Sequence, residues 1–204
     1  MTKKILVFDM DGTIADLYGV DNWLDDLQNE RTRPYEKCKP IYNEEVMNKL
    51  IANLKEVGYK IVITTWLAMN STKEYKREVR KAKLNWLEKI NFDYDEIHLV
   101  QYGTTKADCT RKYKNIEQIL VDDNEEIRNG WHLGRTINAK KNILKELEKL
   151  LQSAWRKELI MYFEFTDEKG NTKLTKVNVF KGVIMRILNY DFYTYVPKSK
   201  IIFK

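Results

Sequence analysis

Residues 5–13 have the sequence Ile-Leu-Val-Phe-Asp-Met-Asp-Gly-Thr. Four consecutive apolar residues without polar alternation are typical of a strand that is buried on both faces, as in a parallel sheet. The run ends in two carboxylates, Asp9 and Asp11, and then in Gly12, which permits a tight loop. The segment therefore predicts a central strand that delivers two acids to the carboxyl end of the sheet, where open α/β sheets bind ligands.

The same pattern of an apolar strand with a polar cluster at its C-terminal end recurs along the chain. It predicts strands over 60–64, 96–100 and 118–121, and residues 135–139 could form one more short strand. Helical periodicity over 43–57, 72–90 and 141–155 separates these segments. Strands that alternate with helices predict an α/β fold with a doubly wound, mostly parallel, Rossmann-like sheet.

Composition narrows the class of protein. The 204 residues are 43% hydrophobic, enough for one substantial core, and the formal charge of +6 fits an anionic ligand such as phosphate or nucleic acid. Lysines on solvated helix faces would explain that excess equally well. Cys38 and Cys109 lie far apart without metal-binding spacing, and no apolar run approaches the roughly 20 residues of a membrane span. We therefore expect a cytoplasmic protein with no membrane partner.

The two acids of the first loop can have different chemical roles. A carboxylate beside a bound divalent cation stays ionised at neutral pH, because the cation stabilises the charged form. Asp9 in that position can act as a nucleophile, and Asp11, further from the metal, can give and take a proton as general acid and base. The alternative is an ordinary acidic turn or a calcium loop, but neither requires the long apolar strand in front.

Three later strand ends carry groups that suit a phosphate or a metal. Thr64 and Thr65 follow one strand, although simple β-propensity would also place threonines there. Lys106 follows the next strand, and its ammonium could neutralise a transferring phosphoryl group, whereas a solvated role is the default for a lysine. Asp122 and Asp123 end the fourth strand, and adjacent carboxylates repel each other unless a cation lies among them.

These four segments, in this order, resemble the motifs of the haloacid dehalogenase-like (HAD) phosphatase superfamily. The first motif matches from Val7 to Thr13. The resemblance implies that Asp9 is an aspartyl-phosphate nucleophile, that Asp11 is the general acid/base, and that the cofactor is Mg²⁺. The remaining implied roles are phosphate binding by Thr64, Thr65 and Lys106, and magnesium binding by Asp9, the Asp11 backbone carbonyl and Asp123, with Asp122 either a further ligand or the group that orients Lys106.

Within the superfamily, the chain resembles the 5′(3′)-deoxyribonucleotidase group and its bacterial and phage relatives over about residues 3–150. Three short segments carry this resemblance. They are Asp-Gly-Thr-Ile-Ala-Asp at 11–16, Ile-Thr-Thr-Trp at 63–66 and Val-Asp-Asp-Asn at 121–124. This resemblance implies a 5′-nucleotidase that acts on (deoxy)nucleoside monophosphates beneath a helical cap. Only residues 17–42 can form such a cap here, and it is short. Four aromatic residues near the expected mouth could stack a base: Tyr18, Trp23, Tyr35 and Trp66. Trp23 could equally be the buried face of its helix.

The C-terminal part departs from the α/β pattern. After a catalytic domain over 1–156, residues 157–204 predict a β-rich extension with a hairpin of 158–166 and 172–180 around a turn at 167–171. Its interleaved basic and aromatic residues could contact nucleic acid, cover a hydrophobic edge or form a dimer, so the oligomeric state stays open. Two alternatives to a nucleotidase follow, a polynucleotide-end phosphatase and a non-catalytic module that binds a nucleotide or a partner. His98 and His132 lie outside the motifs and are expected to be structural or surface residues.

Overall fold

The computed structural model describes residues 4–158, 160–166, 172–178 and 200–203, and it describes side chains over 4–154. The chain forms two compact units, residues 1–148 and 149–204. The sequence analysis placed the domain boundary after residue 156. The division between the two compact units falls inside a long helix, α7 (Ile143–Glu158), and the boundary after residue 156 stays a prediction.

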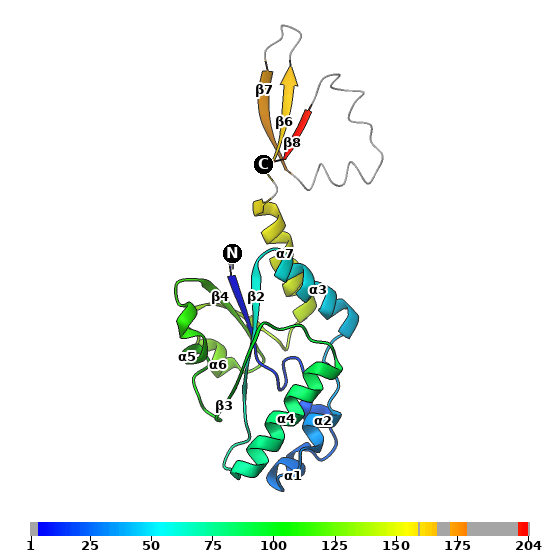
Figure 1. The fold of residues 1–204 in the computed structure, drawn as a ribbon, viewed down its shortest axis with the longest axis vertical. Helices are drawn as coiled ribbons and strands as arrows, with labels where there is room; N and C mark the ends of the chain where they lie inside the picture. Colours follow the sequence, from blue (N-terminus) through cyan, green and yellow to red (C-terminus); the bar gives the residue numbers. More distant parts are fainter. Residues whose placement is uncertain (1–3, 159, 167–171, 179–199, 204) are drawn as a thin grey trace. The chain divides into compact units, whose positions relative to one another are not determined.

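The first unit is built on a five-stranded sheet, and all of its strand pairs are parallel. The strands lie in the order β3-β2-β1-β4-β5, so the apolar strand that begins the chain is central (Figure 1). The register places Phe8 beside both Ile63 and Val121, and the Asp9 amide donates to the Val121 carbonyl oxygen at 2.9 Å. The predicted α/β sheet is confirmed, with strand bounds of β1 Lys4–Phe8, β2 Tyr59–Trp66, β3 Glu96–Val100, β4 Glu117–Asp122 and β5 Gly134–Asn138.

Helices cover both faces of this sheet. Figure 1 shows α5 (Lys106–Thr110) and α6 (Glu125–Asn129) on one side and α3 (Glu44–Glu56) and α4 (Lys73–Lys89) on the other. The two long helices begin where the sequence indicates, because the side chains of Asn43 and Thr72 accept hydrogen bonds from backbone amides of the first turn. Both faces of the three inner strands, β1, β2 and β4, are buried, which accounts for their continuous apolar runs.

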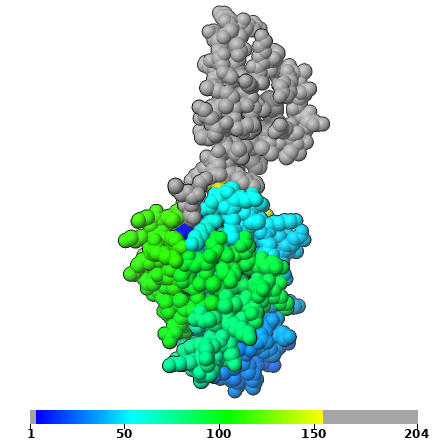
Figure 2. Space-filling model, in the orientation of Figure 1, coloured from blue at the N-terminus to red at the C-terminus, as the bar shows by residue number. Residues whose placement is uncertain are grey.

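The predicted cap consists of three short helices, η1 (Leu17–Gly19), α1 (Trp23–Gln28) and α2 (Arg33–Lys37). Within the cap, α2 contacts α4, and the two segments lie side by side (Figure 2). Glu30 accepts hydrogen bonds from the Thr72 amide at 2.7 Å and hydroxyl at 2.6 Å. Tyr75 Oη and Trp86 Nε1 donate to cap carbonyl oxygens, each at 2.9 Å. The cap is thus a fixed part of the first unit.

In the second unit, β6 (Ile160–Thr166) pairs with both β7 (Thr172–Asn178) and β8 (Lys200–Phe203) in antiparallel fashion. The predicted pair of strands is present, whereas the predicted turn at 167–171 and most of the basic and aromatic segment lie outside the described residues. Within the described ranges, no helix combines the length and the apolar character that crossing a membrane requires.

Candidate active site

Three carboxylates converge at the carboxyl ends of two neighbouring strands. Asp9 follows β1, Asp122 ends β4 and Asp123 comes next, and each offers an oxygen within 4.8 Å of the other two. Carboxylate oxygens are the ligands that Mg²⁺ prefers in proteins, and a cluster of acids this close is unfavourable without positive charge among them. The donor set therefore fits a divalent cation, as the sequence analysis predicted.

Lys106 supplies positive charge to this cluster from the first residue of α5. Its Nζ donates to Asp9 Oδ1 and to Asp122 Oδ2, both at 2.6 Å, and the residue is 4% exposed. Burial lowers the pKa of the ammonium, but the charges of Asp9 and Asp122 outweigh burial and raise the pKa overall. An ammonium has three donors, so within the described residues one N–H of Lys106 is left for a phosphate oxygen.

The two adjacent acids of the fourth motif lie in different surroundings. Asp122 Oδ2 accepts from Lys106, and its Oδ1 accepts from the Asn124 amide at 2.8 Å, so both oxygens are already engaged. The carboxylate of Asp123 is partly exposed and lines the adjoining cavity. Of the two roles open for Asp122, this geometry favours orientation of Lys106 and leaves Asp123 as the better placed metal ligand.

Asp11 is not one of the three clustered acids, and its carboxyl group is held by a residue that the sequence analysis missed. Lys83 Nζ donates to Asp11 Oδ2 at 2.5 Å, and Lys83 is completely buried within α4. Burial raises the pKa of the Asp11 carboxyl group, and the charge of Lys83 opposes that rise without cancelling it. A raised pKa favours the protonated form, which a general acid requires.

The loop that carries Asp9 and Asp11 is shaped by its next two residues. Gly12 has φ +80°, and a Cβ there would lie 2.7 Å from a ring carbon of Tyr18 and 2.9 Å from Asp123 Oδ2. The hydroxyl of Thr13, which was also missed as a site residue, donates to Asp9 Oδ2 at 3.3 Å and accepts from the Asp123 amide at 3.1 Å. Thr13 therefore ties the first motif to the fourth.

The two threonines of the second motif are buried at the end of β2. Thr65 Oγ1 accepts a hydrogen bond from Lys83 at 2.7 Å, whereas Thr64 Oγ1 has no hydrogen-bond partner among the described residues. Neither threonine is among the residues that line the cavity beside the acids. Their role in phosphate binding stays a prediction.

A cavity of about 470 Å³ opens over the acid cluster. Asp9, Asp11, Lys106, Asp122 and Asp123 lie at its polar end, and the cap contributes apolar side chains. All four aromatic residues named from the sequence line this cavity, together with a fifth, Tyr102. They include two pairs of rings in contact, Tyr18 with Trp23 at a centroid distance of 4.9 Å and Trp66 with Tyr102 at 4.7 Å.

Comparison with known proteins gives likenesses of structure only. No protein-family model matches the chain, and no curated protein matches it. A D,D-heptose 1,7-bisphosphate phosphatase from B. bronchiseptica, crystallised with magnesium and phosphate, is 12% identical with a TM-score of 0.46, over 74% of this chain and 99% of that one. A candidate HAD-like phosphatase from Mesorhizobium loti is also 12% identical with a TM-score of 0.46, over 75% of this chain and 88% of that one. A D,D-heptose 1,7-bisphosphate phosphatase from Burkholderia thailandensis is 13% identical with a TM-score of 0.40, over 73% and 99%.

The acid cluster leads to a prediction about stability. Burial and the neighbouring charge of Asp9 raise the pKa of Asp123, and the same two causes raise the pKa of Asp122 to about 6. Acids whose pKa is higher in the folded state stabilise the fold while they are protonated and lose that contribution as the pH rises through the raised value. At pH 7 without metal, Asp123→Asn should therefore raise the free energy of unfolding.

Thermal unfolding in EDTA and in magnesium measures this effect. The unmodified protein should gain about 2.7 kcal/mol when free magnesium is 100 times Kd, and Asp123→Asn should lose most of that gain. The advantage of Asp123→Asn in EDTA should also shrink between pH 7 and pH 4. Asp21→Asn, at an exposed position, is the matched control. Destabilisation by Asp123→Asn in EDTA, or a full magnesium response, would contradict the assignment.

Proposed function

We propose that the chain is a magnesium-dependent phosphomonoester hydrolase that works through an aspartyl-phosphate on Asp9. One observation carries the proposal: Lys106 joins Asp9 to Asp122, Asp123 lies beside them, and the group opens into a cavity that also contains Asp11. The cavity thus has beside it the groups that phosphoryl transfer needs: a nucleophile, a cationic amine and metal-binding acids. It also has a second carboxyl group, that of Asp11, whose pKa is raised.

In the proposed reaction, an Asp9 carboxylate oxygen attacks phosphorus and the bond from phosphorus to the ester oxygen breaks. The electron pair leaves with that oxygen, which takes the proton of Asp11. Water then attacks phosphorus and gives a proton to Asp11, and the bond from phosphorus to Asp9 breaks to release inorganic phosphate. Lys106 offers its remaining N–H to the transferring phosphoryl group.

The metal-binding residues in this proposal are Asp9, Asp123 and the backbone carbonyl of Asp11, with Asp122 holding Lys106. A bound magnesium ion would supply positive charge next to the transferring phosphoryl group and so reduce its repulsion from Asp9. Thr13 holds the Asp9 carboxylate from the other side. Release of phosphate from a panel of phosphomonoesters with magnesium, and no release in EDTA, is the expected result; no release under either condition would contradict the proposal.

We further propose a nucleoside monophosphate as the substrate. The aromatic rings around the cavity support this choice, because every base has a face that can stack on them. The cap also lines part of the cavity and is held to α4 by hydrogen bonds. A cavity that is partly covered in this way suits a small phosphate ester. A polynucleotide end remains the second candidate from the sequence, but its main support, the basic and aromatic tail, lies largely outside the described residues.

Replacing an aromatic wall residue should separate base recognition from chemistry. Tyr18 is 49% exposed, lines the cavity and contacts Trp23, so Tyr18→Ala should remove one stacking surface. We expect kcat/KM for a nucleoside monophosphate to fall about tenfold, since stacking on an aromatic side chain contributes about 1–3 kcal/mol. Turnover of ribose 5-phosphate, which has no base, should change little.

Steady-state kinetics with the two esters and with a 5′-phosphorylated oligonucleotide tests both substrate proposals. A nucleoside monophosphate should have the highest kcat/KM in the unmodified protein. Equal losses for ribose 5-phosphate and the nucleotide in Tyr18→Ala would contradict base stacking. Preference for the oligonucleotide would favour the polynucleotide-end alternative.

A further inference from the structure

The most unusual side chain outside the four motifs is a lysine inside the core. Lys83 has no exposed surface, although a charged group is almost never fully buried unless it is paired. It belongs to a stripe along α4 at spacing four, with Tyr75, Val79 and Leu87, all buried. A hydrophobic residue would suit this place in the stripe, so a lysine here calls for an explanation beyond packing.

The contacts of Lys83 leave it no donor for a ligand. Its Nζ donates to Asp11 Oδ2 at 2.5 Å, to Thr65 Oγ1 at 2.7 Å and to the Trp66 carbonyl oxygen at 2.9 Å. These three acceptors use all three donors of an ammonium. The Tyr35 ring, 5.1 Å from Nζ, occupies a further side. Lys83 therefore acts on Asp11 rather than on a substrate, in contrast to Lys106, which retains a donor.

The two oxygens of Asp11 are consequently different. Oδ2 is fixed by Lys83, whereas Oδ1 is buried without a hydrogen-bond partner among the described residues, and Asp11 lines the cavity. A buried, unpaired carboxyl oxygen is unfavourable in itself and is a feature of sites that await a partner. Since β2 supplies two of the three acceptors of Lys83, the ammonium is held from the sheet and can in turn hold the carboxyl group.

We propose that Lys83 is a positioning residue for the phosphatase reaction: it fixes one oxygen of Asp11 so that the other faces the ester oxygen and, later, the attacking water. This inference rests on the proposed function of Asp11. It assigns to α4, which carries none of the four motifs, a direct part in the geometry of proton transfer.

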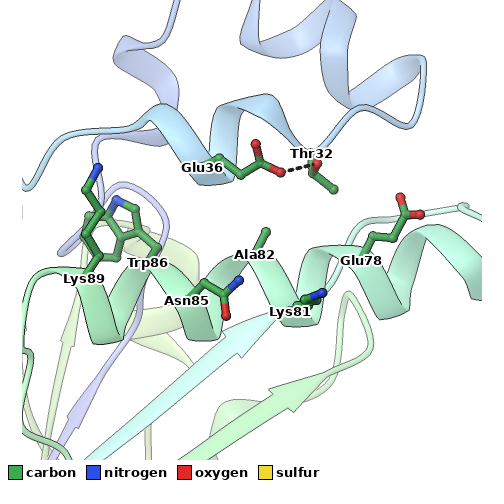
Figure 3. Close-up of a pocket in the computed structure, with 8 residues that line it drawn as sticks. All are labelled: Thr32, Glu36, Glu78, Lys81, Ala82, Asn85, Trp86 and Lys89. Carbon is green, nitrogen blue, oxygen red and sulfur yellow. Dashed lines mark hydrogen bonds between the residues drawn. The ribbon is translucent and has the colours of Figure 1, made fainter.

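The neighbouring lysine on the same helix provides a matched control. Lys81 is exposed and lines a separate cavity of about 530 Å³ between α2 and α4, together with Ala82, Asn85 and Trp86 (Figure 3). Lys81→Met makes the same change of charge on the same helix as Lys83→Met, but on a surface that does not include Asp11. It should leave kcat and KM unchanged.

The test compares two esters that differ in their need for a proton. The first ester is a nucleoside 5′-monophosphate, whose alcohol is released only when its leaving oxygen is protonated. The second is p-nitrophenyl phosphate, whose p-nitrophenolate leaves without a proton. In Lys83→Met, first-turnover cleavage of the nucleotide should fall on the order of 10²-fold, the range of general acid catalysis. First-turnover release of p-nitrophenolate should fall far less, and later turnovers should be slow, which gives a burst. KM for the nucleotide should stay nearly constant, whereas the steady-state KM for p-nitrophenyl phosphate should fall because the phosphorylated form of Asp9 accumulates.

Two further variants exclude a merely structural role. In an Asp11→Asn background, Lys83→Met should cause no further loss, because the residue acts through Asp11. Thr65→Val keeps the ammonium of Lys83 but removes one of its fixed acceptors. It should lose more activity on the nucleotide than on p-nitrophenyl phosphate, as Lys83→Met does but to a smaller extent, and this test holds even if Lys83→Met does not fold. Equal losses for both esters, no loss, or additive effects with Asp11→Asn would overturn the proposal. An unmodified protein that cleaves neither ester would instead refute the proposed function.

Discussion

Asp9→Asn is expected to slow phosphate release on the order of 10⁴-fold or more, while the protein stays folded. The single amide oxygen of asparagine can still accept the hydrogen bond that Lys106 gives to Asp9 Oδ1, but the NH2 in place of Oδ2 cannot accept the one from Thr13, and an amide cannot serve as the nucleophile. Loss of one of three clustered carboxylates also lowers their mutual repulsion. Steady-state kinetics with magnesium, together with circular dichroism and thermal unfolding, measures both parts of this expectation.

The control for this variant is Asp21→Asn, an exposed change of the same kind in the cap. It should leave activity and unfolding temperature unchanged. Activity that persists in Asp9→Asn at more than a few per cent would mean that another group is the nucleophile. A loss of activity that merely follows loss of folded protein would leave the role of Asp9 unsupported, and the thermal unfolding data separate the two cases.

Lys106→Met should have the second large effect, on stability and activity together. Removal of the ammonium leaves Asp9 and Asp122 buried without their shared partner. Breaking a buried ion pair by removal of one member typically costs about 3–5 kcal/mol, so a clear fall in the free energy of unfolding is expected. Phosphoryl transfer should slow on the order of 10²-fold or more, since Lys106 also stabilises the transition-state charge.

Magnesium should restore part of the stability of Lys106→Met, because a cation among the same acids replaces some of the lost charge. Chemical denaturation in EDTA and in magnesium measures that recovery. Lys114→Met is the matched control, since Lys114 is exposed and lies shortly after α5. A variant that unfolds like the unmodified protein in EDTA would contradict the burial and pairing of Lys106.

The sequence predicted the sheet well because local signals and tertiary environment agree there. Residues 5–8 of β1 are apolar without interruption, which burial on both faces explains, and β3 has the bounds that the sequence indicated. Asp9, Lys106, Asp122 and Asp123 could be placed together because the carboxyl ends of parallel strands meet at one end of a sheet. In the structure Lys106 contacts Asp9 and Asp122, and Asp123 lies beside the two acids.

Lys83 escaped prediction for a physical reason. Its partner Asp11 lies 72 residues earlier in the chain, and a helix rich in lysine offers no local sign of which ammonium is buried. One usable signal was its place in the stripe with Tyr75, Val79 and Leu87, where every other residue is apolar. The orientation of Thr64 and Thr65 was equally inaccessible, because alternate residues of a strand point to opposite faces and the register was unknown.

The central claim is that Asp9 becomes covalently phosphorylated during turnover. The most direct measurement is to mix the protein with magnesium and a phosphomonoester, quench with acid within the first turnover and analyse the peptides by mass spectrometry. The account predicts one phosphoryl group on the peptide that carries Asp9, and none on that peptide from Asp9→Asn. Rapid phosphate release with no phosphoryl group on that peptide at any quench time, or with a phosphoryl group on another residue, would contradict it.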